Sequence, residues 1–176
     1  QPRDRWRTQA EARRLRQAAK HVPHLYRFIV IGLKTGSRLD AILGLKWEWI
    51  DLDARLMRRR DEGTKETKKR TPPVRLGRSL TRLLRRWKAK DSGAKYVVHY
   101  NGKRIHRIKQ TWDKAVERAG LKGVTPHTMR HTRATWLMQA GVSSFEAAGH
   151  LGMSVDVLQR VYAKHSPDHQ EKASEV

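Results

Sequence analysis

The chain has no cysteine among its 176 residues. A disulfide scaffold, a cysteine-ligated zinc site and a thiol nucleophile are therefore excluded, and the composition fits a reducing compartment. No run of about 18 apolar residues could span a bilayer, the longest candidate being residues 25–33. The start of the chain, Gln1-Pro2-Arg3-Asp4-Arg5, has no apolar segment like that of a secretion signal and no initiating Met. We therefore expect a soluble protein, and a cut-out or processed fragment.

Acidic residues are also scarce. The chain has 17 Asp and Glu against 39 Lys and Arg, so its formal net charge is +22. Hydrophobic residues make up 38% of it and include six Trp, which is enough apolar material for the core of one domain. An excess of this size destabilises a compact chain unless a polyanion binds it, and nucleic acid is the usual polyanion. A membrane surface is a weaker interpretation, because the charge is spread along the chain rather than gathered on one amphipathic helix.

Helical patterns occupy most of the chain. Residues 7–20 read as a charged helix, and Pro23 fits the first turn of a second one that ends at Gly36. Ser37 can cap a third helix through residue 45. Further helices are predicted over residues 79–90, 105–119, 126–139, 144–151 and 154–161. Thr125 is the predicted cap of the helix over residues 126–139, and Gly141 follows its end. The tryptophans at positions 47, 49, 87, 112 and 136 are interpreted as core anchors.

Short strands interrupt this pattern in two places. Residues 56–61 and 73–76 read as strands on either side of a very basic connection, residues 62–70, which predicts a hairpin with an exposed loop. Residues 96–100 read as a strand that runs into the tight turn Asn101-Gly102. The predicted fold class is therefore mainly α with a small antiparallel β-sheet.

Four places in the chain stand out from a solvated basic surface. They are Arg38 at a helix junction, Lys65 in the basic loop, the segment His127-Thr128-Met129-Arg130 at a helix start, and Tyr162. Each alone would more often be a surface or packing residue. Their combination is what indicates a site.

The combination resembles the catalytic domain of the tyrosine recombinases, the phage-integrase and Xer-like family. In that family Arg, Lys, His-x-x-Arg, a His or Trp, and a nucleophilic Tyr occur in this order. The matching segments here are Thr35-Gly36-Ser37-Arg38, Gly63-Thr64-Lys65, Thr125-Pro126-His127-Thr128-Met129-Arg130, and Leu151-Gly152-Met153-Ser154 leading to Tyr162. The resemblance runs from about residue 25 to about residue 168, and it implies the tyrosine-recombinase catalytic core as the fold.

The chemistry of these residue types agrees with that resemblance. A tyrosine hydroxyl, with an ordinary pKa of about 10, is a poor nucleophile until a base or a strong positive field favours the phenolate. A planar guanidinium can hold two phosphate oxygens at once, which suits Arg38 and Arg130 to the charge that develops as Tyr162 attacks. The resemblance makes Lys65 the general acid for the leaving 5′ oxygen, with Lys68 and Lys69 as rivals, and His127 a group that assists proton transfer or hydrogen-bonds the phosphate.

One position departs from the family pattern. The second His or Trp stands nine residues before the nucleophile, and that position is Met153 in this chain. His150 is a possible substitute, and His165 and His169 are further possible donors. Loss of this auxiliary contact is expected to slow the reaction rather than abolish it, because the arginines carry the larger electrostatic contribution.

A metal is not predicted. His127 and His131 have the four-residue spacing of metal ligands on a helix, but the glutamate of a zinc-protease motif is missing and there is no cysteine.

The resemblance implies a site-specific recombinase or integrase that cleaves and rejoins DNA through a 3′-phosphotyrosyl intermediate, without metal, cofactor or ATP, in phage or prophage integration and excision. The alternative is a non-catalytic basic DNA-binding module, and a type IB topoisomerase-like activity would be a variant of the first hypothesis. DNA contacts to phosphate position a protein without choosing bases, so the target sequence is not predicted.

The resemblance also implies a domain organisation and partners. Residues 1–176 would be the catalytic domain, with residues 1–20 as a possible linker helix, residues 167–176 as a C-terminal tail, and the N-terminal core-binding and arm-binding domains absent. The partners would be double-stranded DNA attachment sites, a homotetramer of the full-length protein on DNA, and accessory DNA-bending or directionality factors. The expected location is the cytoplasm of a bacterium or phage-infected host, at the nucleoid.

Overall fold

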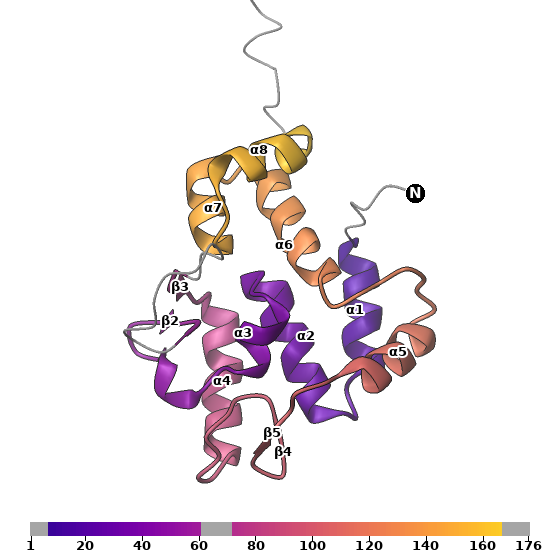
Figure 1. The fold of residues 1–176 in the computed structure, drawn as a ribbon, viewed down its shortest axis with the longest axis vertical. Coiled ribbons are helices and arrows are strands. Elements are labelled where there is room, and N and C mark those ends of the chain that lie inside the picture. Colours follow the sequence, from indigo (N-terminus) through magenta and orange to yellow (C-terminus); the bar gives the residue numbers. More distant parts are fainter. Residues whose placement is uncertain (1–6, 61–71, 167–176) are drawn as a thin grey trace, which may run out of the picture.

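Eight α-helices and two small antiparallel sheets make up residues 7–60 and 72–166, the part of the chain that this computed structural model describes (Figure 1). The helices in chain order are α1 (Gln9–Ala18), α2 (Pro23–Thr35), α3 (Leu39–Leu43), α4 (Arg78–Lys90), α5 (Lys109–Arg118), α6 (Thr128–Gln139), α7 (Ser144–Leu151) and α8 (Val155–Tyr162). Two single-turn helices, η1 (Trp47–Trp49) and η2 (Ala163–His165), complete the set. The predicted fold class, mainly helical with a small antiparallel sheet, is confirmed.

The larger sheet has three short strands in the order β1 (Ile50–Asp51), β2 (Leu56–Met57) and β3 (Val74–Arg75). Its register pairs Met57 with Ile50 on one side and with Val74 on the other, and all three side chains are buried. The predicted hairpin is therefore present as β2 and β3, while its connecting loop, including Lys65, lies outside the described residues. The strand β1 was not predicted, because two residues are too few to show an alternating pattern.

The second sheet is the hairpin of β4 (His99–Tyr100) and β5 (Lys103–Arg104). Asn101 and Gly102 between them have φ values of 49° and 77°, as a tight turn of this kind requires. The prediction of a helix over residues 105–119 is wrong at its start, since residues 105–108 lie in no helix or strand and α5 begins at Lys109. The predicted strand over residues 96–100 is likewise reduced to its last two residues.

The main hydrophobic core is built around α2, which packs against α1, α3, α4 and α6. Nine of the thirteen α2 residues are buried, including Phe28, Ile29 and Ile31, because neighbours surround this helix on most sides. Phe28 meets Trp112 edge to face with ring centroids 6.0 Å apart. Four of the five predicted tryptophan anchors are buried here, and Trp136 packs against the core half-buried.

A second, smaller cluster of buried side chains lies between α7, α8 and the C-terminal half of α6. Figure 1 shows these three helices standing at one end of the molecule, with α6 leading from them into the body. The start of α6 belongs to the main core through Met129, and its later residues Leu137 and Met138 belong to the smaller cluster. The helix α6 therefore joins the two clusters.

Two predicted helix caps are wrong. Ser37 does not cap α3, whose N-cap residue is Arg38 without a side-chain bond, because the Ser37 hydroxyl lies 2.8 Å from that of Thr35. Thr125 does not cap α6, because Thr125 and Thr128 are hydrogen-bonded in a turn and the helix begins after His127. Each hydroxyl has a local partner that competes with the capping role.

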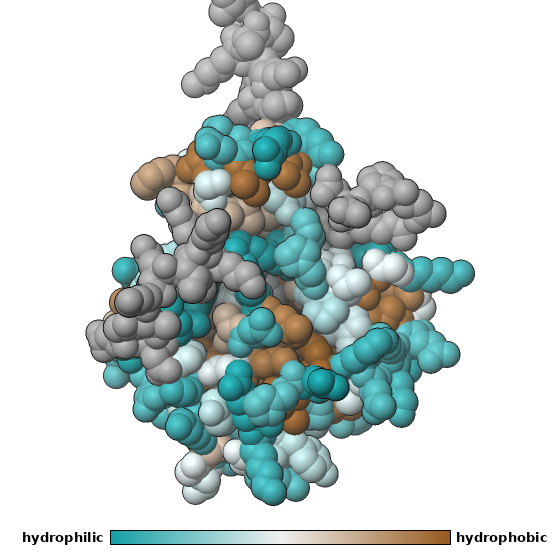
Figure 2. Space-filling model, in the orientation of Figure 1, coloured by the Kyte–Doolittle hydropathy of each residue, from teal (hydrophilic) through white to brown (hydrophobic). Residues whose placement is uncertain are grey.

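Hydrophilic side chains cover most of the face shown in Figure 2. Among the described helices, none has both the length and the apolar character needed to cross a membrane.

Candidate active site

A pocket of about 450 Å³ opens where the two hydrophobic clusters meet. Its lining includes Arg38, His127, Arg130 and Tyr162, which are four of the residues predicted from the sequence. They come from the start of α3, the start of α6 and the end of α8. The rest of the lining is His131, Gly152, Met153, Ser154, Val157 and Val161. Residues up to 124 positions apart are thus brought to one cavity, as an active site requires.

Arg130 is the more enclosed of the two arginines that line the pocket, with 5% of its surface exposed. Its Nη1 donates to the backbone carbonyls of Gly36, at 2.8 Å, and Leu151, and its Nη2 donates to the carbonyl of Gly152 at 3.2 Å. A guanidinium has five N–H donors. Three are used by these carbonyls, so two remain for a ligand in the pocket that Arg130 lines.

Those carbonyls belong to the C-terminal ends of two helices. Gly36 caps α2 and Gly152 caps α7, both with a left-handed backbone at φ values of 63° and 66°. The last carbonyls of a helix lack partners within the helix and carry the negative end of its dipole, so a cation there is stabilised. Through these charged hydrogen bonds, Arg130 of α6 holds together the C-terminal ends of α2 and α7.

The positive field of the pocket comes from three guanidiniums rather than two. Burial, followed by the charges of Arg130 and Arg38, lowers the pKa of Arg59 to about 9. Burial, followed by the charge of Arg38, lowers the pKa of Arg130 to about 10, while Tyr162 acts in the opposite direction. Both groups stay charged at neutral pH, and their mutual repulsion is relieved when an anion enters.

Arg59 was missed by the sequence reasoning. It follows β2, is 5% exposed, and donates from Nη2 to the carbonyls of Thr35, at 3.3 Å, and His150. In the sequence it stands in the run Arg58-Arg59-Arg60, so nothing distinguishes it from its two half-buried neighbours. It does not line the pocket but adds charge behind it.

Tyr162 is buried at the end of α8, with 5% of its surface exposed, and its hydroxyl is hydrogen-bonded to Nδ1 of His131. The His131 ring also meets the His127 ring edge to face, with centroids 4.6 Å apart. The residues His127, His131 and Tyr162 therefore form a continuous row along one wall of the pocket. In the tautomer that carries its proton on Nε2, His131 can accept the Tyr162 proton at Nδ1.

The pairing of His131 with Tyr162 was also missed. The signal in the sequence was the four-residue spacing of His127 and His131, which places both on one helix face, but it was weighed only as a metal-ligand pattern. Within residues 7–60 and 72–166, no group of three His, Asp or Glu side chains lies close enough to hold a metal ion. Two imidazoles and a phenol are groups that can hydrogen-bond and transfer protons.

His127 is kept neutral by its surroundings. Burial first, and then the charges of His131, Arg130 and Arg38, lower its pKa below the ordinary value. A neutral imidazole carries one donor and one acceptor, so His127 can hydrogen-bond an oxygen in the pocket without a full charge.

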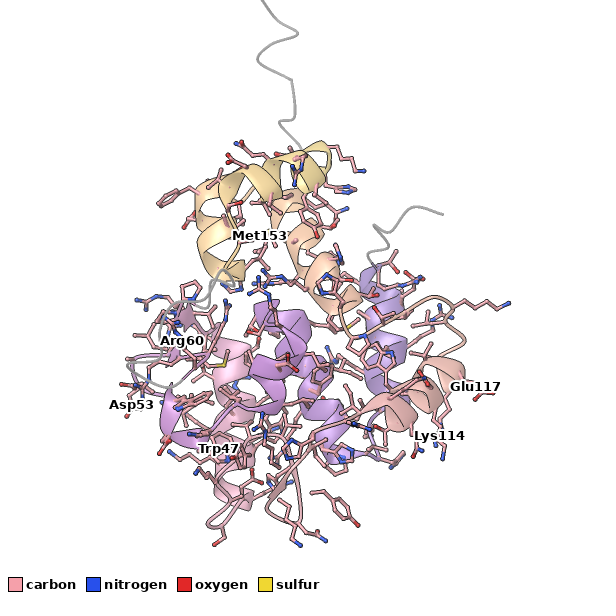
Figure 3. All side chains as sticks on the ribbon, viewed as in Figure 1. Trp47, Asp53, Arg60, Lys114, Glu117 and Met153 are labelled. Carbon is pink, nitrogen blue, oxygen red and sulfur yellow. The ribbon has the colours of Figure 1, made fainter. Side chains whose placement is uncertain are left out.

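His150 is not brought into the pocket. It stands near the end of α7, where its Nε2 lies 3.5 Å from Nη2 of Arg133. Burial, followed by the charges of Arg133 and Arg59, lowers its pKa to about 4, so it is neutral at physiological pH. Met153, in the α7–α8 part of the molecule labelled in Figure 3, does line the pocket. The predicted role of Lys65 falls on a residue outside the described part.

The arrangement suits attack by a hydroxyl on a phosphodiester. Tyr162 supplies the hydroxyl, His131 an adjacent acceptor, and Arg38 and Arg130 the cations for negative oxygens. The pocket volume of about 450 Å³ has room for a phosphate group beside these side chains.

Comparison with known proteins gives the family. The family model described as the phage integrase family matches residues 5–169. The tyrosine recombinase XerC of Corynebacterium glutamicum is 29% identical over 135 residues, which is 73% of this chain and 42% of the relative. The integrase of Salmonella phage P22 is 28% identical over 179 residues, which covers 94% of this chain and 45% of the relative.

The fold agrees with that match. The structure of the Tn1549 transposon integrase in complex with transposon right end DNA is similar with a TM-score of 0.77 and 21% identity, covering 96% of this chain and 64% of that one. The chain spans less than half the length of the two relatives. On the match of residues 5–169, this chain belongs to the phage integrase family, the tyrosine recombinases.

Proposed function

We propose that this chain carries the catalytic site of a site-specific DNA recombinase, which cleaves and rejoins DNA strands through an ester between Tyr162 and a 3′ phosphate. The observation that carries the proposal is the hydrogen bond between the Tyr162 hydroxyl and His131 in a pocket that Arg38 and Arg130 also line. A buried tyrosine in such a positive environment has a base at its oxygen and cations for the phosphate it attacks.

The proposed step balances without an added cofactor. The Tyr162 oxygen forms a bond to phosphorus, its proton passes to Nδ1 of His131, and the bond from phosphorus to the 5′ oxygen breaks. Lys65 gives the leaving 5′ oxygen a proton, as the family resemblance implies. Attack by a 5′ hydroxyl on the tyrosyl ester reverses the sequence and rejoins a strand. One phosphodiester-type bond replaces another at each stage, so no ATP is consumed.

Charge on the non-bridging oxygens is the main cost of this step. Arg38 and the two remaining donors of Arg130 are the groups we assign to it, with His127 adding a hydrogen bond. Loss of a single preorganised donor at a developing oxyanion typically lowers a rate by about 10²–10³-fold. We expect effects of that order for each arginine.

The proposed substrate is double-stranded DNA with specific attachment sites, in phage or prophage integration and excision. A net charge of +22 and the DNA-bound structure of a similar integrase support DNA as the partner. Residues 1–176 would act as the catalytic domain of a longer protein that assembles as a homotetramer on paired sites, with residues 167–176 as the contact between protomers and accessory factors setting direction. The place of action would be the bacterial or phage-infected cytoplasm.

The experiment is a covalent-trapping assay. The protein is incubated with duplexes that carry a nick beside the scissile phosphate, so that a released fragment prevents rejoining. The unmodified chain and Tyr100→Phe, which alters an exposed tyrosine, should form an adduct that survives denaturation, whereas Tyr162→Phe should form none. Tight binding without an adduct from the unmodified chain would overturn the proposal and favour a non-catalytic DNA-binding module.

The role of His131 is tested in the same assay. His131→Ala should slow adduct formation by about 10²-fold, the usual size of a general-base contribution, and added imidazole should restore part of the rate. An unchanged rate in His131→Ala would contradict the assignment of His131 as the acceptor.

A further inference from the structure

A second cationic surface lies outside the catalytic pocket, along the exposed face of α1. Two depressions meet there, of about 480 Å³ and about 180 Å³, and both are lined by Arg13 and Arg16. Neither shares a lining residue with the catalytic pocket. We call this surface the α1 groove, and its cations are Arg13, Arg16, Lys20, Lys34, Arg86, Lys90 and Arg133.

Four helices supply the groove. Arg13, Arg16 and Lys20 stand at positions i, i+3 and i+7 of α1 and its end, so they share one face, and Arg86 and Lys90 share a face of α4. The inner end is formed by Lys34 of α2 and Arg133 of α6. The cations are thus aligned by the fold rather than scattered over the surface.

No acidic residue in the described part of the chain lines either depression. The nearby Glu11 is paired instead with Arg7 and with the backbone of Thr8. A depression on another face, between β1 and α4, is different, because there Asp53 neutralises Arg85 at 2.7 Å. Among the described residues that line it, the α1 groove therefore carries positive charge with no acidic side chain to balance it.

At the inner end of the groove, the positive charges repel one another. Burial, followed by the charges of Arg133 and Arg16, lowers the pKa of Lys34. The Nε atom of Arg133 is buried and makes no hydrogen bond within the described structure. An anion in the groove would reduce the repulsion between Lys34 and the neighbouring arginines.

The length of the groove fits a polyanion. Tyr26 of α2 lines one depression and Lys34 the other, and eight helical residues span about 12 Å. One strand of duplex DNA presents a phosphate about every 3.4 Å along its axis, so about three phosphates match this length. Gln17 and Tyr26, whose side chains carry neutral donors, also line this depression.

We propose that the α1 groove binds the phosphate backbone of duplex DNA at a place distinct from the reacting phosphate. Such a contact holds a length of duplex against α1 and α4 while the catalytic pocket holds another phosphate. Strand cleavage at Tyr162 is not needed for it, so the two proposals can fail separately.

The test measures the salt dependence of DNA binding in the Tyr162→Phe background, which forms no covalent adduct. A labelled 30-base-pair duplex is titrated at several salt concentrations. The triple variant Arg13→Gln, Arg16→Gln and Arg86→Gln should lower the log–log slope by about 2 to 3, because each lost phosphate contact removes about 0.9. The matched control, Lys114→Gln, Arg118→Gln and Lys122→Gln, removes the same charge from the α5 region and should change the slope by less than about 1.

Equal changes in the two triple variants would show only a general charge effect and would overturn the proposal. An unchanged slope in the groove variant would also overturn the proposal. In that case an acidic protein surface would be the next candidate to bind the α1 groove.

Crosslinking locates the DNA independently. Because the chain has no cysteine, Gln17→Cys introduces one thiol in the groove, and Glu117→Cys introduces one on the outer side of α5 (Figure 3). With a photoactivated azide on that thiol, Gln17→Cys should crosslink to the duplex at least several-fold more than Glu117→Cys. Equal yields, or a crosslink confined to the scissile nucleotide, would contradict a separate site.

Discussion

The substitution Arg130→Lys should lower the stability of the folded protein and also slow the formation of the covalent adduct. Arg130 spans carbonyls of two helix ends, with bonds to Gly36 at 2.8 Å, Leu151, and Gly152 at 3.2 Å. A hydrogen bond from a charged donor contributes about 1.5–3 kcal/mol. A single ammonium cannot reach all three carbonyls in this geometry, so the loss of one to two bonds costs about 3 kcal/mol. For a chain of this length, that corresponds to a melting temperature lower by about 6–12 °C.

The assay is thermal and urea unfolding followed by tryptophan fluorescence, for which the chain offers six reporters. Arg38→Lys is the control, because Arg38 lines the same pocket but is only half-buried, and it should shift unfolding by less than about 1 kcal/mol. Equal unfolding temperatures for Arg130→Lys, Arg38→Lys and the unmodified chain would refute the idea that Arg130 joins the two helix ends.

Three further predictions concern the surroundings of the site. Gly36→Ala should lower the free energy of unfolding by about 2–4 kcal/mol, because a Cβ there adds left-handed strain and lies 2.3 Å from a leucine side chain. Gly141→Ala adds the strain alone and should lower it by about half as much. Equal losses of stability would contradict the steric argument. The pKa of His150 is about 4 in the folded chain and 6.5 for the ordinary group, so only the unfolded state takes up its proton between those values and stability falls as the pH drops from 6.5 to 4. Solvent screening limits this pH-dependent loss of stability to about 2 kcal/mol. Urea unfolding at several pH values should show the loss for the unmodified chain and for the exposed-site variant His21→Gln, but not for His150→Gln. Met153→His should raise the rate of adduct formation about 10-fold by adding a donor to the pocket, and an unchanged rate would mean that the auxiliary contact is not limiting.

Much of the helical framework could be predicted from the sequence. Apolar spacing and the glycine at position 36 predicted the bounds of α2 closely, and α7 was predicted with its observed bounds. Short elements could not be predicted, because the strands β1 and β5 have two residues each and depend on pairing with distant or adjacent segments. Helix starts were misplaced where a hydroxyl had another partner, as at Ser37.

The candidate site was predicted in part. Arg38, His127, Arg130 and Tyr162 were identified because their order resembles that of the tyrosine recombinases, and they line one pocket. The partners that complete the site depend on tertiary packing, since the contact between His131 and Tyr162 spans 31 positions and the burial of Arg59 depends on the ends of α2 and α7. His150 was assigned by distance along the chain, which does not reveal that its ring faces Arg133.

The most direct test of the central claim is to identify the covalent link itself. The adduct trapped on a nicked duplex is digested with protease and nuclease, and tandem mass spectrometry locates the nucleotide on the peptide while end-labelling reports the released strand. We predict a 3′-phosphonucleotide on the oxygen of Tyr162 and a free 5′ hydroxyl on the other fragment. A nucleotide on any other residue, or a 5′ phosphate on the released strand, would contradict the account.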